Sequence, residues 1–412
     1  MIMANTQISP GEIKLFNVKA DGVDITSMVM TVDLFQDLFM PTWSCTVAFS
    51  DTQNLLMNIP IKPGTEIELK LETDYPENES KLFKFVVYKI SDRVQIKQEH
   101  QGYMINCVTK EFFTNQKTRI SKSFKSSTVP AAVCTIVEQF GLGAIDEQDS
   151  APTVYSFIIP NMSPFAAINW ISRFSVGTSG GADFIFYQSD HGEFKYRSLD
   201  KMLVDRSGIK FKQLNPNTFD DSGKIPLENF LNIERYEFLT NHDSLNNFAA
   251  GYYGNSTLSH DLYTKKFKLS KFNYGDDIPH DAEKKPFDGH YFNNVNNSHI
   301  VYHPVSTNGM GNNITIPSDT HEDWLGSRKT NVMKLEENRL VMTVPGAVSH
   351  YKLLGKQVDV ELPSHQDIDD SQYLDKYLKG SYVVAAIRHI ISTEAYKCVI
   401  ELGKKRLDKA YE

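Results

Sequence analysis

Histidine and aspartate residues gather in one stretch of the chain and are the first candidates for chemistry. The six residues are Asp288, His290, His299, His303, Asp319 and His321. Imidazole and carboxylate groups together can bind zinc or iron. Their spacing matches no known ligand pattern, and the spacing is what makes a metal prediction specific. We therefore predict that these side chains are solvated in polar loops and hold no metal.

Paired aspartates are the second candidates. They occur at Asp220-Asp221, Asp276-Asp277 and Asp369-Asp370. Two carboxylates that face each other across a cleft can hydrolyse a glycosidic bond. Aspartate is also common in turns, where its side chain bonds to nearby backbone groups. We predict turn and solvation roles for these pairs, and a glycan-degrading enzyme is kept as an alternative.

Other motifs of catalysis are not found in the sequence. There is no H-E-x-x-H, no G-x-S-x-G, no P-loop and no G-x-G-x-x-G between a strand and a helix. The glycine-rich residues 177–181 follow a predicted helix, so no helix N-terminus is aimed at an anion. Trp43, Trp170 and Trp324 are too dispersed for a sugar platform and are predicted to pack in cores or interfaces. The sequence therefore predicts no enzyme, and no catalytic, metal or cofactor-binding residues.

Composition narrows the class of protein. The chain has 412 residues, with 43 Lys and Arg against 51 Asp and Glu, which gives a net charge of −8. This length corresponds to two or three domains, and 41% hydrophobic residues exclude wholesale disorder. An acidic chain is poorly suited to gripping nucleic acid, because phosphate binding needs a basic surface.

Compartment signals point to the cytosol. The four cysteines, at positions 45, 107, 134 and 398, are scattered and contain no C-x-x-C, so neither a disulfide framework nor a zinc site is expected. The first residues lack the basic and apolar regions of a signal peptide. The longest apolar run, residues 382–387, is far shorter than the ~20 residues of a membrane span. We expect a soluble protein that does not insert into membranes.

Strands are expected in the first 115 residues. Apolar and charged residues alternate over residues 66–72, which places Ile67, Leu69 and Leu71 on a buried face. Residues 43–49, 82–90 and 103–108 are also predicted strands, and a short helical turn is predicted over 51–57. The opposite face of 66–72 carries Glu66, Glu68, Lys70 and Glu72. This face is predicted to be solvated, and in a channel its mostly acidic wall would keep DNA from sticking.

An α+β module is expected next. One helix runs from Val129, capped by Thr128, to a stop at Gly141, and a second begins at Ser163-Pro164. A hairpin follows, with strands over 183–188 and 193–197. Strand patterns resume over 230–239. Residues 260–330 are rich in Asn, Gly, His and Asp and are predicted to form an insertion with only fragmentary regular structure.

The two ends of the chain contain a repeat. Residues 64–71 and 355–362 match in their turn glycine and in their alternating apolar and polar positions. Residues 85–88 and 382–385 are the next matching strands, and residues 103–108 and 394–399 align Cys107 with Cys398. Alternation alone is generic, but three aligned elements in the same order favour a duplicated β domain. Three chains would then present six quasi-equivalent domains.

This order of elements resembles the baseplate hub proteins of contractile-tailed bacteriophages, relatives of late control protein D and of the hub part of type VI secretion spike proteins. Three segments carry the resemblance: residues 51–71 with the turn 59–64, residues 163–200, and residues 379–402 with Arg388-His389. The resemblance implies a mainly β fold with an α+β module, in which two tandem tube-like antiparallel β-barrel domains are interrupted by a smaller α+β domain.

The implied domains are residues 1–117 for the first barrel and 206–240 with 331–405 for the second. Residues 118–205 with 241–330 form the α+β module and its Asn-rich insertion, and 406–412 form a tail. The implied function is structural: a homotrimeric, pseudo-sixfold ring in the virion tail that joins the hexameric tail tube to the trimeric spike.

The implied partners are further copies of the chain, a separate spike protein, tube or tube-initiator proteins and the tape measure protein. DNA would pass through the lumen without specific binding, and assembly would take place in the host cytoplasm. Two alternatives are kept: a tail-associated enzyme that degrades cell wall or glycan, and another β-rich component such as a distal tail protein.

Overall fold

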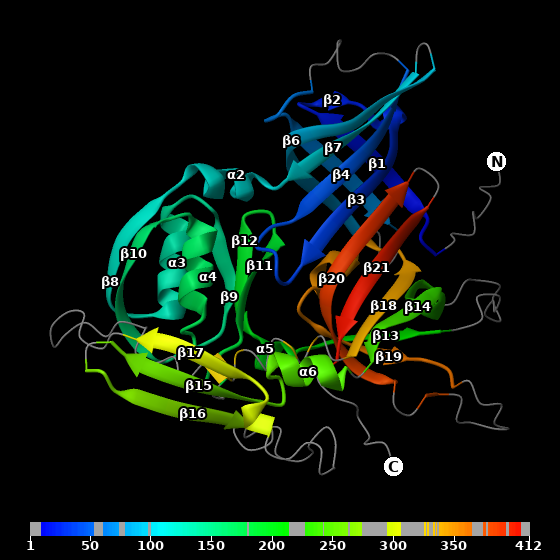
Figure 1. The fold of residues 1–412 in the computed structure, drawn as a ribbon. Helices are drawn as coiled ribbons and strands as arrows, with labels where there is room; N and C mark the ends of the chain where they lie inside the picture. Colours follow the sequence, from blue (N-terminus) through cyan, green and yellow to red (C-terminus); the bar gives the residue numbers. More distant parts are fainter. Residues whose placement is uncertain are drawn as a thin grey trace. The chain divides into compact units, whose positions relative to one another are not determined.

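The chain forms two compact units (Figure 1), and each is described by itself. The structure is a computed structural model that describes residues 10–52, 61–73, 79–97, 100–178, 181–213, 227–241, 243–262, 264–273, 295–305, 325, 326, 328, 333, 335, 338–364, 374, 375, 378–392 and 395–404. None of the helices within these ranges has the length and apolar character needed to cross a membrane.

The first unit comprises Met1–Phe113, Arg206–Glu237 and Leu340–Leu402 and is built around one sheet of 13 strands. The strands of its N-terminal part are β1 (Ile13–Ala20), β2 (Val23–Asp24), β3 (Val29–Asp37), β4 (Ser44–Asp51), β5 (Glu66–Thr73), β6 (Glu79–Lys97) and β7 (His100–Val108). Those of its later parts are β13 (Arg206–Lys212), β14 (Arg235–Asn241), β18 (Asn338–Pro345), β19 (Gln357–Glu361), β20 (Gly380–Ser392) and β21 (Tyr396–Gly403). Three 3-10 helices accompany them: η1 (Thr26–Met28), η2 (Leu227–Leu231) and η7 (Val348–Leu353).

The strands predicted in the first 115 residues are present. Strand β5 buries Ile67, Leu69 and Leu71, as the alternation predicts, because successive side chains of a strand point to opposite faces. Strands β4, β6 and β7 cover the other three predicted segments. The helical turn predicted over 51–57 lies mostly outside the described residues.

The sheet contains the same strand order twice. Neighbouring strands run β1-β5-β6-β7-β4-β3 in the first block and β13-β19-β20-β21-β18-β14 in the second. Without the two-residue strand β2, which pairs only with β1 in the described sheet, each block has six strands. Numbered along the chain, these six lie in the spatial order 1-4-5-6-3-2 in both blocks. The repeat predicted from sequence aligned β5 with β19, β6 with β20 and β7 with β21, and the strand order confirms all three alignments.

A turn with the same hydrogen bonds occurs at the same place in both blocks. The Gly64 N–H donates to the Val87 carbonyl at 2.8 Å, and the Gly355 N–H donates to the Val384 carbonyl at 3.0 Å. Both glycines have positive φ, +99° and +74°. Each is the third residue of a four-residue turn closed by a backbone hydrogen bond, of 3.0 Å in the first block and 2.9 Å in the second. Glycine suits this position because an L side chain disfavours positive φ.

The two blocks differ at one edge and are joined at another. Strand β1 pairs antiparallel with β5, whereas β13 pairs parallel with β19. Strand β3 of the first block pairs with the Ala386–Ser392 part of β20, so that both blocks belong to one continuous sheet. The sequence did not predict this connection, and closure of each block into a barrel stays a prediction.

The second unit comprises Thr114–Asp205, Phe238–Arg339 and Gly403–Glu412 and combines helices with three small sheets. Its helices are α2 (Lys110–Lys117), which begins in the first unit, α3 (Val129–Gln139), α4 (Pro164–Ser172), α5 (Leu199–Met202), α6 (Ser244–Ala250) and the 3-10 helix η5 (Val295–Asn297). Its sheets are β10 (Val154–Met162) with β8 (Ile120–Thr128), then β11 (Phe184–Asp190) with β12 (Glu193–Ser198) and β9 (Ala144–Gln148), and finally β16 (Phe267–Asn273), β15 (Gly254–Asp261) and β17 (Ile300–Val305).

Both predicted helices of the module are confirmed. Thr128 caps α3 by accepting a hydrogen bond from the Ala131 N–H, and Gly141 follows the helix with a φ of +69°. Helix α4 begins at Pro164, and the predicted hairpin is formed by β11 and β12.

One expectation needs correction. The segment 230–239, predicted as a strand, begins inside η2, and strand β14 starts only at Arg235. The segment 260–330, predicted to have only fragmentary regular structure, lies mostly outside the described residues, and its described part contributes β16 and β17 to a sheet with β15. Strand β15 was overlooked because Gly254–Asp261 contains a single aliphatic residue, Leu258, and shows no alternation of apolar and polar residues.

Candidate functional site

The candidates named from the sequence do not form a site in the described part of the chain. His299 Nδ1 lies 2.9 Å from the Ala249 carbonyl oxygen, and His303 Nδ1 lies 3.2 Å from the Pro304 carbonyl oxygen. The other histidines and aspartates of that group, and all three aspartate pairs, lie outside the described residues. Among described residues, no three His, Cys, Asp or Glu side chains could hold a metal ion.

Two of the three tryptophans pack against other aromatic rings, as the sequence predicts. Trp43 is buried against Phe83 and Tyr351, with ring centroids 6.1 Å away in both cases. Trp170 is half-buried and contacts Phe157 and Phe174. Trp324 lies outside the described residues.

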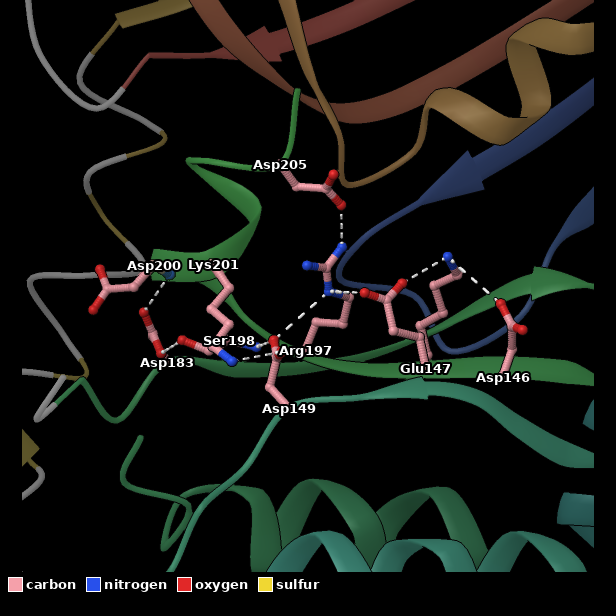
Figure 2. Close-up of polar contacts among 10 residues, drawn as sticks. Asp146, Glu147, Asp149, Asp183, Arg197, Ser198, Asp200, Lys201 and Asp205 are labelled. Atoms are coloured by element: carbon pink, nitrogen blue, oxygen red, sulfur yellow. Dashed lines mark hydrogen bonds and ion pairs between the residues drawn. The ribbon is translucent and has the colours of Figure 1, made fainter. Parts of the chain in front are cut away.

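A group of polar residues in the second unit is joined by ion pairs and hydrogen bonds (Figure 2). It consists of Asp146, Glu147, Asp149, Asp183, Lys195, Arg197, Ser198, Asp200, Lys201 and Asp205. Parallel pairing of β9 with β12 brings Glu147 opposite Lys195. Helix α5 follows β12 directly, so that residues distant in sequence meet at one end of the sheet.

Arg197 is the centre of this cluster. Its guanidinium is buried and lies 2.5 Å from Asp205, 3.1 Å from Glu147 and 3.6 Å from Asp149. Burial alone would lower the pKa of Arg197, but the hydrogen bond to Asp205 and the nearby carboxylates outweigh this and raise it. Arg197 therefore stays charged in the interior, where each partner carboxylate offsets the cost of desolvation.

Ser198 links two buried carboxylates. Its backbone N–H donates to Asp149 Oδ2 at 2.9 Å, and its hydroxyl donates to Asp183 Oδ1 at 2.8 Å. The second oxygen of Asp183 accepts the Asp200 N–H at 3.0 Å, at the start of α5. These contacts, drawn in Figure 2, fasten β9, β12 and α5 together.

This arrangement holds the unit together and leaves the described carboxylates bound to protein groups. A general acid needs a proton to give, and a nucleophile needs an accessible lone pair. Asp149 and Asp183 instead accept hydrogen bonds from the chain. No sequence pattern predicts this cluster, because its members belong to segments about 50 residues apart. The only local signal is the alternation of Lys195 and Arg197 on a strand.

The polar face of β5 differs from the mostly acidic wall expected from the sequence. Lys84 of β6 lies 3.2 Å from Glu66 and 2.7 Å from Glu68. Lys14 lies 3.4 Å from Glu72. Cross-strand lysines therefore neutralise this face, a relation that only the pairing of strands creates.

The chain resembles known proteins in structure but matches none of the curated proteins in sequence. No protein-family model matches the chain, and no curated protein matches it by sequence. A tail protein from Neisseria meningitidis MC58 is similar in structure, with a TM-score of 0.56 and 13% identity over 94% of this chain and 96% of that one. The 43 kDa tail protein of prophage MuSo2 from Shewanella oneidensis has a TM-score of 0.54 and 11% identity over 95% and 96%. The chain thus shares the fold of these two tail proteins along nearly its whole length.

Proposed function

We propose that the chain is a structural protein of a phage baseplate, the central hub whose trimer joins the hexameric tail tube to the trimeric spike. The observation that carries this proposal is the sheet block that occurs twice with one strand order. Three copies would place six similar blocks around one axis, which matches a sixfold tube on one side and threefold symmetry on the other. The fold shared with two tail proteins supports a place in a phage tail.

The pairing of β3 with β20 inside one chain suggests how two copies contact each other. Strand β3 ends the first block and pairs with the part of β20 that extends beyond β19. The equivalent end of the second block is β14, the last strand of the described sheet path. The equivalent acceptor is the part of β6 beyond Val86, where the described pairing with β5 stops.

In the proposed ring, β14 of one copy pairs with this part of β6 in the next copy. Such a contact joins two different surfaces, and repetition closes a ring when the rotation per copy is right. It also covers strand edges that would otherwise invite aggregation. On the same ground, we propose that the first unit comprises two tube domains, one for each block.

The β5 face would line the lumen in this proposal. Its lysine–glutamate pairs leave little net charge, so that DNA would slide past without specific binding. Spike, tube and tape measure proteins are the proposed partners, and the virion tail is the proposed location. We propose no enzymatic activity for the hub.

Crosslinking tests the ring directly. Leu239 on β14 and Val94 on β6 are both exposed in the single chain and would come close together between copies. A Leu239→Cys, Val94→Cys double variant, in a Cys134→Ser background, should give covalent trimers with a short bismaleimide. Each single variant should give none, and Leu245→Cys with Val94→Cys is the matched control.

Native mass spectrometry of the unmodified protein, alone and with its spike, gives the stoichiometry. Three copies are expected. A stable dimer, or a monomer that never assembles with spike, would contradict the hub. Six copies would favour the distal tail alternative, and turnover of peptidoglycan abolished by one carboxylate variant would favour the enzyme.

A further inference from the structure

The strands β16, β15 and β17 form a small sheet in the second unit (Figure 1). One face of this sheet carries apolar side chains. Strand register fixes which side chains share it: Leu258 lies between Leu269 and Tyr302, and His260 lies between Phe267 and Pro304. Ile300 belongs to the same face, two residues before Tyr302. We call these seven residues the outer face.

The polarity of this sheet is the reverse of the usual arrangement. Phe267, Leu269, Ile300 and Tyr302 are 53–63% exposed. The alternate residues of the central strand, Asn255, Thr257 and Ser259, are buried. A sheet with one solvated face normally turns its polar side outward, since burial of apolar area stabilises the fold. Here, within the described part of the chain, the apolar side of the sheet is the exposed one.

The aromatic side chains on the outer face are already held in place. The rings of His260 and Phe267 stack, with centroids 4.1 Å apart and planes 5° apart. His260 Nδ1 also lies 2.8 Å from the Tyr302 hydroxyl oxygen. Stacking covers one face of each of these two rings and fixes the position of both on the surface. A fixed apolar surface of this kind binds another protein surface at little cost in side-chain entropy.

The area and the charge of the outer face indicate what kind of molecule binds there. Four side chains of roughly 200 Å² each, a little over half exposed, give about 450 Å² of apolar area, within the range of functional patches. The rim carries Lys265 and Lys266 in the β15–β16 turn and Lys271 at the far end, all exposed. The turn's one carboxylate, Asp261, is engaged by Thr264 at 2.6 Å.

We propose that the outer face is the docking site for a different protein chain, one that presents apolar side chains bordered by carboxylates. Two copies meeting through this same face would set the lysine rims against each other, which disfavours a symmetric self-contact. Acidic groups on the partner would instead face Lys265, Lys266 and Lys271. The inference rests on the proposed function only in supplying a multi-protein assembly as the setting.

Photocrosslinking tests this proposal in the cells that naturally make the chain. A p-benzoylphenylalanine at position 269 replaces Leu269, which makes no side-chain hydrogen bond that would be lost. The expected product is a crosslink to one different polypeptide, at a peptide rich in Asp or Glu. The same crosslinker at Leu245, 80% exposed outside the outer face, is the matched control and should give no specific product.

Charge and shape variants complete the test. Lys271→Glu and Ile300→Glu should each reduce the crosslink yield about tenfold or more, while Lys271→Arg should preserve it. Both positions are exposed, so the melting temperature should stay unchanged in all three variants. A crosslink to a second copy, or to no protein at all, would overturn the proposal. The crosslinking is done in whole cells, so its result does not depend on whether the chain is found in purified tails. The presence of the chain in purified tails tests the proposed function separately.

Discussion

His389 Nδ1 lies 2.7 Å from the hydroxyl oxygen of Tyr396 in the buried core of the second block. Tyr396 donates its hydroxyl to the Ala347 carbonyl at 3.1 Å, and Cys398 Sγ lies 3.3 Å from the same His389 nitrogen. Among the described residues, the other ring nitrogen, Nε2, has no hydrogen-bond partner, and neither nitrogen of the nearby buried His350 has one. A neutral histidine pair is thus enclosed where a charge would be unsupported.

Acid should destabilise the first unit through these two rings. Burial lowers the pKa of His350 to about 4, and burial with the charge of His350 lowers that of His389 to about 3, from an ordinary 6.5. Between pH 6.5 and about 4 the unfolded chain binds more protons than the folded one, so stability falls as the pH falls. The slope should approach about 2.7 kcal/mol per pH unit for the pair.

Urea unfolding at several pH values checks this slope. His350→Leu should remove about half of it. Phe211→Leu, which alters the ring packed against His350 without changing a titrating group, should lower stability equally at every pH. A slope that is unchanged in His350→Leu would contradict the assignment.

The repeated turn predicts that substitution of either of its two glycines lowers the free energy of unfolding by a similar amount. Gly64→Ala and Gly355→Ala should each destabilise the first unit by about 1–2 kcal/mol, because alanine disfavours positive φ. A side chain at position 64 meets no atom within 4 Å, so the cost there is conformational. Gly64→Asn should recover part of the loss, since asparagine tolerates this conformation. Thermal unfolding measures all three, and a neutral Gly64→Ala would mean the turn is not needed.

Charge placed in the core should reveal that the two blocks unfold together. Leu69 of β5 and Val360 of β19 are both buried, and Leu69→Asp or Val360→Asp should cost about 3–5 kcal/mol by burying an unpaired charge. Lys70→Asp, at an exposed position of β5, is the control and should cost under about 1 kcal/mol.

Fluorescence of Trp43, in a chain whose other tryptophans are phenylalanine, reports this unit. Because β3 and β20 join the blocks, both variants should shift the same transition. A Trp43 transition that does not respond to Val360→Asp would show that the blocks unfold independently.

Removal of Arg197 should destabilise the second unit. Arg197→Met leaves Asp149, Glu147 and Asp205 without their shared cation and should cost about 3–5 kcal/mol. Lys195→Met, which removes more exposed ion pairs with Asp146 and Glu147, should cost about 1 kcal/mol or less. Denaturation followed by Trp170 fluorescence measures both. Equal losses in the two variants would contradict the central role of Arg197.

The sequence by itself determined the features that local physics controls. Alternation placed Leu69 in the core, Thr128 and Gly141 marked the ends of a helix, and the turn glycines 64 and 355 carried the repeat. Each of these depends on the conformation of a few consecutive residues, so the pattern is readable without knowledge of the partner.

Tertiary structure alone decided the rest. The Arg197 cluster, the lysines that neutralise Glu66 and Glu68, and the β3–β20 junction join separate segments of the chain, and no local pattern reports such pairings. Strand β15 was hidden because its inward face is polar; its neighbours β16 and β17 order it through backbone hydrogen bonds. Pairing across the chain follows from the total burial and hydrogen bonding of the fold, which a single segment does not encode.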